Sequence, residues 1–162
     1  MSSPKLSSDF TKTPTGETPA GPPLIGALLR IPWETVRARM LERLHEQGFT
    51  DFDAAHLNVF LYPGPQGERP TELAERLGIS RQALNYLLGQ LERLDYLERL
   101  PDPDDQRSKR IAVLPRGRSA IQVIRNAVGE VEREWKATLG ATRFAQLRDL
   151  LLELTSTERE RA

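Results

Sequence analysis

Residues 73–87 read LAERLGISRQALNYL, a pattern typical of a helix-turn-helix. Leu73 begins an apolar face with one-turn spacing, and Ala74 is small enough to let a second helix cross closely. Gly78 permits the positive φ of a tight turn, and Ser80 is a favoured first residue of the next helix. Several independent requirements are met at the required spacings, so this stretch predicts two short helices crossing over a tight turn.

The outward face of the second helix carries polar side chains near its N-terminal end. An arginine can bond guanine through two hydrogen bonds, and asparagine or glutamine can bond adenine in the same way. A recognition helix presents this half to the major groove, and the free N–H groups of its first turn can bind a phosphate. The alternative is an ordinary solvated face, but the helix-turn-helix context favours DNA readout. The predicted contacts are Ser80, Arg81, Gln82, Asn85 and Tyr86.

The rest of the chain reads as further helices and one hairpin. Pro32 lies inside the first apolar stripe, so that helix either kinks there or begins near Trp33. Thr71 is the expected N-cap of the third helix. Apolar periodicity predicts helices over 24–47, 53–61, 71–77, 80–94, 116–139 and 142–154, and strands over 96–100 and 110–114.

The expected hairpin is strongly basic. Residues 106–118 contain five basic residues and no acidic residue. A basic hairpin beside a helix-turn-helix favours a DNA-binding wing, with Arg107 as the candidate for the minor groove. Asp105 is close enough in sequence to orient Arg107. The alternative is a solubilising charged loop. The predicted wing contacts are Arg107, Lys109 and Arg110.

The composition places limits on the class of protein. The chain has 162 residues, equal numbers of basic and acidic residues, and no cysteine. Disulfides and thiolate metal sites are therefore excluded, and no apolar run is long enough for a membrane helix. Residues 1–22 are rich in Ser, Thr and Pro and predict a disordered tail without a secretory signal. These features predict a cytoplasmic protein, whose zero net charge averages over oppositely charged regions.

The helix-turn-helix and hairpin together resemble the MarR family of bacterial transcriptional regulators. The residues that carry the resemblance are the wing run DPDDQR at 102–107 and the following IAVLPRG at 111–117. The resemblance implies a homodimer that binds pseudo-palindromic operator DNA, with Arg81, Gln82 and Asn85 on the recognition helix. The chain departs from the family pattern in two places. Gln106 stands where many members carry arginine, and Asp95 stands where glycine is common.

The predicted fold class is mainly α with a small β-hairpin wing: a winged helix-turn-helix dimerised through its N- and C-terminal helices. Residues 23–162 are expected to form a single MarR-like unit, with the DNA-binding lobe at 53–115. The dimerisation helices are expected at 24–48 and 116–155, because their apolar stripes exceed what the small lobe can cover alone; packing within one chain is the alternative. The predicted interface residues are Leu24, Leu28, Phe144, Leu147, Leu151 and Leu154.

Sites for smaller molecules are weakly indicated. His56 follows Asp53 by three residues, but two ligands without cysteine favour a polar boundary histidine over a metal site. The resemblance implies a pocket for a small anionic or aromatic effector, although the same residues are equally consistent with core and boundary roles. No metal, no cofactor and no catalytic constellation is predicted. The candidate pocket residues are Arg30, Trp33, Arg37, His56 and Tyr62.

The predicted function is a sequence-specific, DNA-binding transcriptional regulator and not an enzyme. Its partners would be double-stranded DNA, a second copy of the chain and a small effector, with no membrane. The resemblance favours a repressor that releases its operator when the effector binds. The alternative is a winged-helix module for protein interaction, or for ligand or metal sensing, without sequence-specific DNA binding. The polar and basic recognition face favours the first reading.

Overall fold

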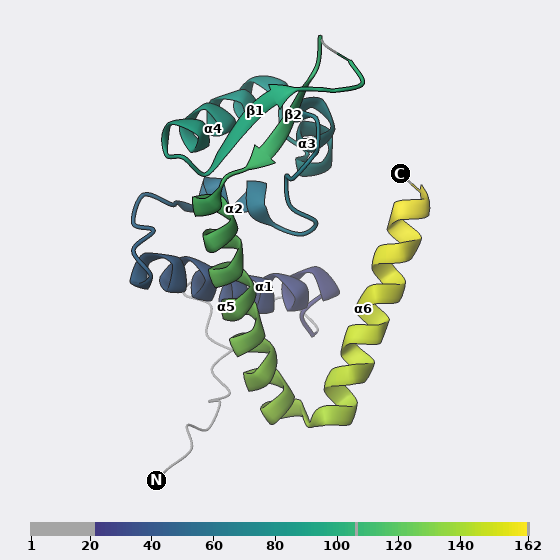
Figure 1. Cartoon of the computed structure of the whole chain (residues 1–162). Helices are drawn as coiled ribbons and strands as arrows, with labels where there is room; N and C mark the ends of the chain where they lie inside the picture. Colours follow the sequence, from purple (N-terminus) through teal and green to yellow (C-terminus); the bar gives the residue numbers. More distant parts are fainter. Residues whose placement is uncertain (1–21, 106, 162) are drawn as a thin grey trace, which may run out of the picture. The chain divides into compact units, whose positions relative to one another are not determined.

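The computed structural model describes residues 22–105 and 107–161. The predicted tail at 1–22 therefore lies almost entirely outside the described residues, as does Gln106. The chain divides into two units, one ending at Trp33 and one beginning at Glu34. The elements in chain order are α1 (Ile25–Glu46), α2 (Ala54–Phe60), α3 (Pro70–Leu77), α4 (Arg81–Arg93), β1 (Leu97–Pro101), β2 (Lys109–Val113), α5 (Pro115–Leu139) and α6 (Ala141–Arg161) (Figure 1).

The predicted starts of the helices agree closely with the structure, with two corrections. Helix α1 includes Pro32, so the predicted alternative of a helix that begins near Trp33 is wrong. Helix α3 begins one residue early, with Arg69 as its N-cap and Pro70 in its first turn, so the prediction of Thr71 as N-cap is also wrong. Proline suits the first helical position because its missing N–H has no partner there in any helix.

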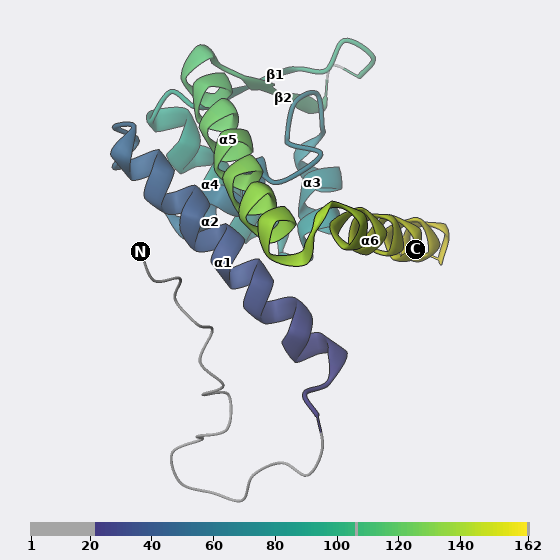
Figure 2. The ribbon, with the colours of Figure 1, turned by 90° about the horizontal axis from the view of Figure 1, so that it is seen from below.

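The two strands form an antiparallel hairpin in which Arg99 pairs with Ile111. The free edge of β2 is also covered, because Ile111 N–H donates to Glu68 O at 3.0 Å and Gly67 N–H donates to Ile111 O at 2.8 Å. Covering the edge satisfies backbone groups that would otherwise invite pairing with another chain. In both views α4 lies beside β1 and α3 lies beside β2 (Figures 1 and 2).

The core lies between the small helices, the hairpin and the start of α5. Phe52 and Tyr96 meet edge to face with ring centroids 5.1 Å apart, and Phe60 packs against both. Ile111 and Val113, two residues apart on β2, are both buried and form the inward face of the hairpin. Other fully buried side chains are Met40, Leu44, Leu57, Val59, Leu73, Leu84, Leu88, Leu91 and Leu97.

Helix α5 begins where the hairpin ends, and its start requires a glycine. A Cβ on Gly117 would lie 2.1 Å from Tyr96 O and 2.8 Å from a methyl group of Val113. The backbone of the lobe therefore approaches α5 more closely than any side chain allows. Helix α6 follows Gly140 and runs to Arg161, beyond the predicted end at residue 154.

Charged side chains join the second half of α1 to α5. Arg43 Nε donates to Glu130 at 2.9 Å, and Arg39 Nη1 donates to Glu134 at 2.9 Å and to Glu130 at 3.3 Å. The hydrogen bond from Arg43 is the largest cause of the lowered pKa of Glu130. Within the described part of the chain, no helix has the length and apolar character needed to cross a bilayer.

Candidate nucleic-acid interface

The turn between α3 and α4 has the geometry that the sequence predicts. Gly78 adopts φ 64° and ψ 31°, the left-handed conformation that glycine takes without strain. Leu73 and Ala74 are buried where the helices meet, and Leu84 and Leu88 form the inward face of α4. The predicted helix-turn-helix is therefore present. Because α4 buries one side against the core, the opposite side of α4 faces outward.

Ser80 is the N-cap of α4, as predicted. Its hydroxyl oxygen accepts a hydrogen bond from Ala83 N–H at 3.1 Å. Arg81, Gln82, Asn85 and Tyr86 are all exposed on the opposite side of the helix from the core. Arg81 makes only a loose ion pair with Glu75 at 4.0 Å, and 73% of its side chain is exposed. The N-terminal half of α4 thus presents polar groups to a partner outside the lobe.

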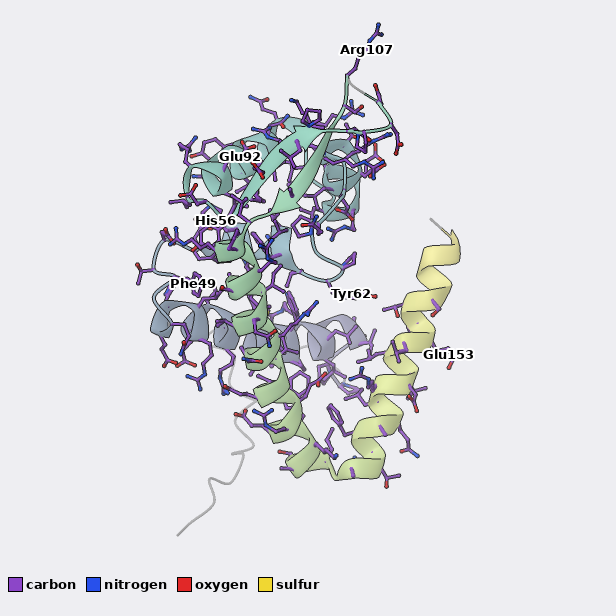
Figure 3. The ribbon with its side chains drawn as sticks, in the orientation of Figure 1. Phe49, His56, Tyr62, Glu92, Arg107 and Glu153 are labelled. Carbon is purple, nitrogen blue, oxygen red and sulfur yellow. The ribbon has the colours of Figure 1, made fainter. Side chains whose placement is uncertain are left out.

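Asn85 is held from the wing side by an arginine that sequence reasoning missed. Arg99, in the middle of β1, donates from Nη1 to Asn85 Oδ1 at 3.1 Å. The same guanidinium donates from Nε and Nη2 to Glu92 at 2.8 and 2.5 Å. Glu92, near the C-terminal end of α4, lies beside β1 (Figure 3). This hydrogen-bonded pairing lowers the pKa of Glu92 and keeps it ionised.

Tyr86 is linked to the interior through two further side chains. Gln90 Nε2 donates to the Tyr86 hydroxyl at 3.2 Å, and Gln90 Oε1 lies 3.3 Å from His56 Nε2. His56 Nδ1 accepts from Asp53 N–H at 3.2 Å, so the proton of a neutral ring lies on Nε2, which then donates to Gln90. The recognition face is therefore connected by hydrogen bonds to the N-terminus of α2.

The wing tip presents Arg107 to solvent. Its side chain projects from the end of the loop, away from the lobe (Figure 3). Asp105 orients this residue through the backbone and not through the guanidinium: Oδ1 accepts from Arg107 N–H at 3.0 Å, and Oδ2 accepts from the Ser108 hydroxyl at 2.7 Å. Lys109 is exposed at the start of β2. The arrangement fixes the turn and leaves the arginine head free of partners among the described residues.

The base of the wing is held by a buried carboxylate. Asp102 is 1% exposed; Arg69 Nε donates to it at 2.7 Å, and Arg110 Nε lies 2.9 Å away. Burial alone would raise the pKa of Asp102, but hydrogen bonds from Asp104 N–H and the two arginines outweigh it, and the pKa is about 2. Arg110 also pairs with Asp104 at 3.1 Å. A DNA contact from Arg110, which remains a prediction, would compete with these bonds.

A second charged cluster joins the lobe to α5. Asp51 accepts from the Tyr96 hydroxyl at 2.6 Å and from Arg116 Nη2 at 2.8 Å. Arg116 also donates to Leu94 O at 2.7 Å and lies 4.5 Å over the Tyr96 ring. Burial first, and then the bond to Asp51, raises the pKa of Tyr96. Asp95, beside this cluster, has φ 59°, which explains why glycine is favoured there.

The predicted effector residues are placed in different surroundings. His56 is 3% exposed and lies inside the core against Phe52, so a boundary position is wrong. Tyr62 is 84% exposed, and Arg37 donates to Ala54 O at 3.2 Å. Arg30 and Trp33 belong to the unit that ends at Trp33. Among the described residues no group of three or more metal-ligating side chains occurs.

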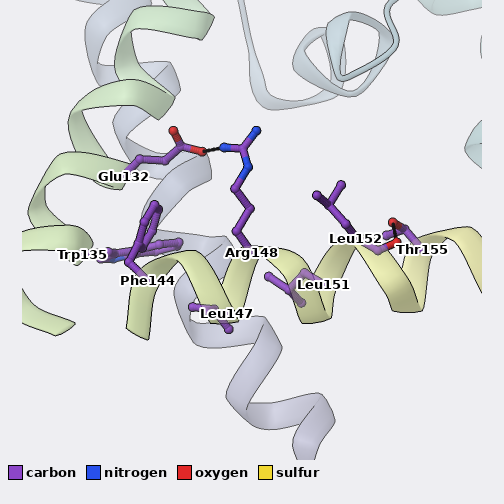
Figure 4. A pocket seen from close by; sticks show the side chains of 8 residues that line it. All are labelled: Glu132, Trp135, Phe144, Leu147, Arg148, Leu151, Leu152 and Thr155. Atoms are coloured by element: carbon purple, nitrogen blue, oxygen red, sulfur yellow. Dashed lines mark hydrogen bonds and ion pairs between the residues drawn. The ribbon is translucent and has the colours of Figure 1, made fainter. Parts of the chain in front are cut away.

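An apolar pocket of about 270 Å³ lies between α5 and α6. Trp135 of α5 and Phe144 of α6 form its base, and an ion pair between Arg148 and Glu132, at 3.4 Å, spans its rim (Figure 4). None of the five predicted effector residues lines it. Its remaining lining residues are Leu147, Leu151, Leu152 and Thr155.

Comparison with known proteins agrees with this geometry. A model described as MarR family matches residues 60–108, which span the end of α2, the helix-turn-helix and most of the wing. No curated protein matches the chain. The match therefore falls on the segment that carries the candidate interface.

Solved structures share the fold over most of the chain. Apo wild-type MarR from E. coli is 24% identical, covers 83% of this chain and 98% of its own, and has a TM-score of 0.65. A MarR transcriptional regulator from Methanosarcina mazei Go1 is 14% identical, covers 85% and 98%, and has a TM-score of 0.69. A mutant of MepR from S. aureus, bound to an oligodeoxyribonucleotide, is 20% identical, covers 84% and 99%, and has a TM-score of 0.54.

Proposed function

We propose that this chain, which belongs to the MarR family of winged helix-turn-helix transcriptional regulators, binds a pseudo-palindromic operator in double-stranded DNA as a homodimer. As a member of that family it is a regulator and not an enzyme. The observation that carries the proposal is the exposed N-terminal half of α4, where Arg81, Gln82 and Asn85 present base-reading groups. The solved relative bound to an oligodeoxyribonucleotide supports the same use of the fold.

The wing supports the proposal through electrostatics. Arg107 is exposed at the tip, and its loop is fixed by Asp105 and by the clamp around Asp102. An arginine presented on a fixed loop suits the minor groove, where narrow A·T tracts attract positive charge. The zero net charge does not oppose this role, because a steering patch needs a local and not a global excess of basic residues.

The exposed leucines of α6 support dimerisation. Leu147, Leu151 and Leu154 are 38%, 39% and 60% exposed in the single chain, and they lie at helical spacing. A row of apolar side chains left in water is typical of a protein interface. A second copy that covers α6 would bury them and would present two α4 helices to successive turns of DNA. Leu24 and Leu28, also exposed, are proposed for the same interface.

Repression and release by a small anionic or aromatic effector complete the proposal. They rest on the family resemblance. Thermal-shift and DNA-release measurements with aromatic acids test the effector. A ligand that neither stabilises the free protein nor lowers its DNA affinity would remove that part of the proposal and leave the DNA-binding part standing.

Selection of bound DNA from a random library tests the proposed function. We expect an enriched inverted repeat whose affinity falls linearly with the logarithm of salt concentration. Matched binding titrations with a shuffled duplex measure the preference. If the selected pool binds no better than the random pool at low salt, the chain is a winged-helix module without sequence-specific DNA binding, and the proposed function is wrong.

A further inference from the structure

Arg99 connects the wing to the recognition helix at a single base-reading side chain. Its guanidinium lies between Asn85 and Glu92, which are two helical turns apart on α4. The backbone N–H of Arg99 also donates to Glu92 Oε1 at 3.1 Å. Glu92 thus binds both the main chain and the head of Arg99, and about 29% of the Arg99 side chain is exposed. The Arg99 guanidinium is therefore held by hydrogen bonds to both Asn85 and Glu92 in the absence of DNA.

The chemistry of arginine settles which atom of Asn85 faces it. A guanidinium has five N–H donors and no acceptor, so only the amide oxygen of Asn85 can lie 3.1 Å from Arg99 Nη1. The amide nitrogen then points to the other side. Among the described residues it donates to no side chain or carbonyl group, and Asn85 is exposed. Asn85 therefore presents two free N–H donors.

This orientation changes the base that Asn85 prefers. Bidentate recognition of adenine needs the amide oxygen to accept from N6 while the nitrogen donates to N7. Here one lone pair of the oxygen already accepts a charge-assisted bond from Arg99, which turns the oxygen toward β1 and leaves only the second lone pair for an adenine amino group. Guanine presents two adjacent acceptors, N7 and O6, in the same groove. A pair of free donors is complementary to guanine.

We propose that Arg99 is a positioning residue that turns the Asn85 amide so that it donates to guanine, with Glu92 as the anchor for Arg99. The proposal rests on the proposed DNA-binding function and specifies the base that one side chain of α4 reads. Arg99 is not itself required to touch a base. It acts through Asn85, so its removal should alter preference at one symmetric position of each half-site.

The test compares DNA selected by the wild type with DNA selected by Arg99→Met combined with Glu92→Gln. The double substitution removes one positive and one negative charge together, so the net charge and the long-range attraction to DNA are preserved. It keeps side chains of similar length at both positions. We expect the preference for guanine over adenine at one position of each half-site to fall roughly tenfold, with the remaining positions unchanged.

The matched control is a second arginine–glutamate pair, Arg76 on α3 and Glu68 just before that helix. Nε and Nη2 of Arg76 each lie 3.0 Å from a carboxylate oxygen of Glu68, so the two pairs have the same kind of bonding. Arg76→Met with Glu68→Gln should recover the wild-type site. Adding Asn85→Ala tests whether Arg99 acts through Asn85. In the Asn85→Ala protein, the Arg99 and Glu92 substitutions should cause no further change in base preference.

A second variant keeps the proposal testable if the double substitution unfolds. Asn85→Asp retains an oxygen for Arg99 and removes the amide donors, so the preference should move from guanine to cytosine, whose N4 amino group donates. The proposal is overturned if the double variant selects the wild-type site at every position, if it weakens binding to all sequences equally, or if Asn85→Asp still selects guanine. A wild type that enriches no site refutes the proposed function instead.

Discussion

Helices α4 and α6 both present side chains to solvent, but they expose opposite chemistry. Helix α4 buries Leu84, Leu88 and Leu91 and turns polar side chains outward. In α6 no described side chain is buried, and Leu150 and Leu152 are 60% and 55% exposed. Polar groups in water are already satisfied, whereas burying a leucine contributes about 1.5–3 kcal/mol. The difference supports the proposed roles of α4 in binding DNA and of α6 in binding a second copy of the chain.

The largest effect is expected from a charge placed on the apolar side of α6. Leu151→Glu puts a carboxylate where a second copy would pack, and we expect the dimer to weaken on the order of 100-fold, with DNA affinity falling alongside because the two half-sites are no longer linked. Sedimentation equilibrium measures the dimer. Gln146→Glu, which adds the same charge at an exposed polar position of α6, should leave it intact. Equal effects of the two substitutions would contradict the assignment of α6.

A smaller and more selective effect is expected on α4. Asn85→Ala removes one base contact per half-site, so specific binding should weaken by about 1–3 kcal/mol per contact. Binding to random DNA and the slope of the salt dependence should stay unchanged, because no phosphate contact is lost. Fluorescence-anisotropy titrations with specific and random DNA at several salt concentrations distinguish the loss of a base contact from the loss of a phosphate contact. A parallel loss on specific and random DNA would show that α4 does not read bases.

The wing tip should behave differently from α4. Arg107→Ala is expected to weaken binding to specific DNA and to random DNA severalfold and by similar factors. It should also lower the slope of log affinity against log salt concentration by about one per protomer. The physical reason is that an arginine in the minor groove releases counterions without reading a full base code. Lys109→Ala, which removes the other exposed basic side chain of the wing, is measured for comparison. Loss of preference at a single base position would place Arg107 among the base-reading residues.

The smallest effect is expected at the wing base, where the substitution changes the thermal stability of the fold. Asp102 has a pKa of about 2 in the folded chain, against about 3.9 when unfolded. The folded-state pKa is the lower of the two, so its stabilising contribution is complete above about pH 4 and is lost as the pH falls toward 2. Asp102→Asn should lower Tm by a few degrees at neutral pH. That difference should shrink between pH 4 and 2; a constant difference would exclude ionised Asp102 as its cause.

Local signals predict one part of this molecule well. Gly78 takes positive φ, Ser80 caps α4, and the leucine and isoleucine residues of 73–88 are all buried or partly buried. Each depends on neighbours within a few positions, and sequence spacing reports such neighbours directly. The two helix starts that differ from the prediction, at Trp33 and Thr71, both involve a proline that the helix accommodates.

The interactions that orient the interface were not predictable from spacing. Arg69 reaches Asp102 across 33 residues, and Arg116 reaches Asp51 across 65. An arginine has many acidic residues to choose from at such separations, and only the fold selects one. Arg99 and Asn85 are 14 residues apart, yet their contact depends on how β1 crosses α4. The sequence therefore predicts candidate DNA-reading residues, and the fold determines which way they face.

A distance between two copies of α4 tests the account most directly. The chain has no cysteine, so Gln82→Cys accepts one spin label per protomer at an exposed position of α4. Electron–electron double resonance on the free protein should give a separation of about 34–36 Å, one turn of DNA. Adding Leu151→Glu should remove the dipolar coupling at a protein concentration between the dimer dissociation constants of the two proteins. A Gln82→Cys dimer without this separation, or a coupling that Leu151→Glu leaves unchanged at that concentration, would contradict a dimer that pairs through α6 to present two α4 helices.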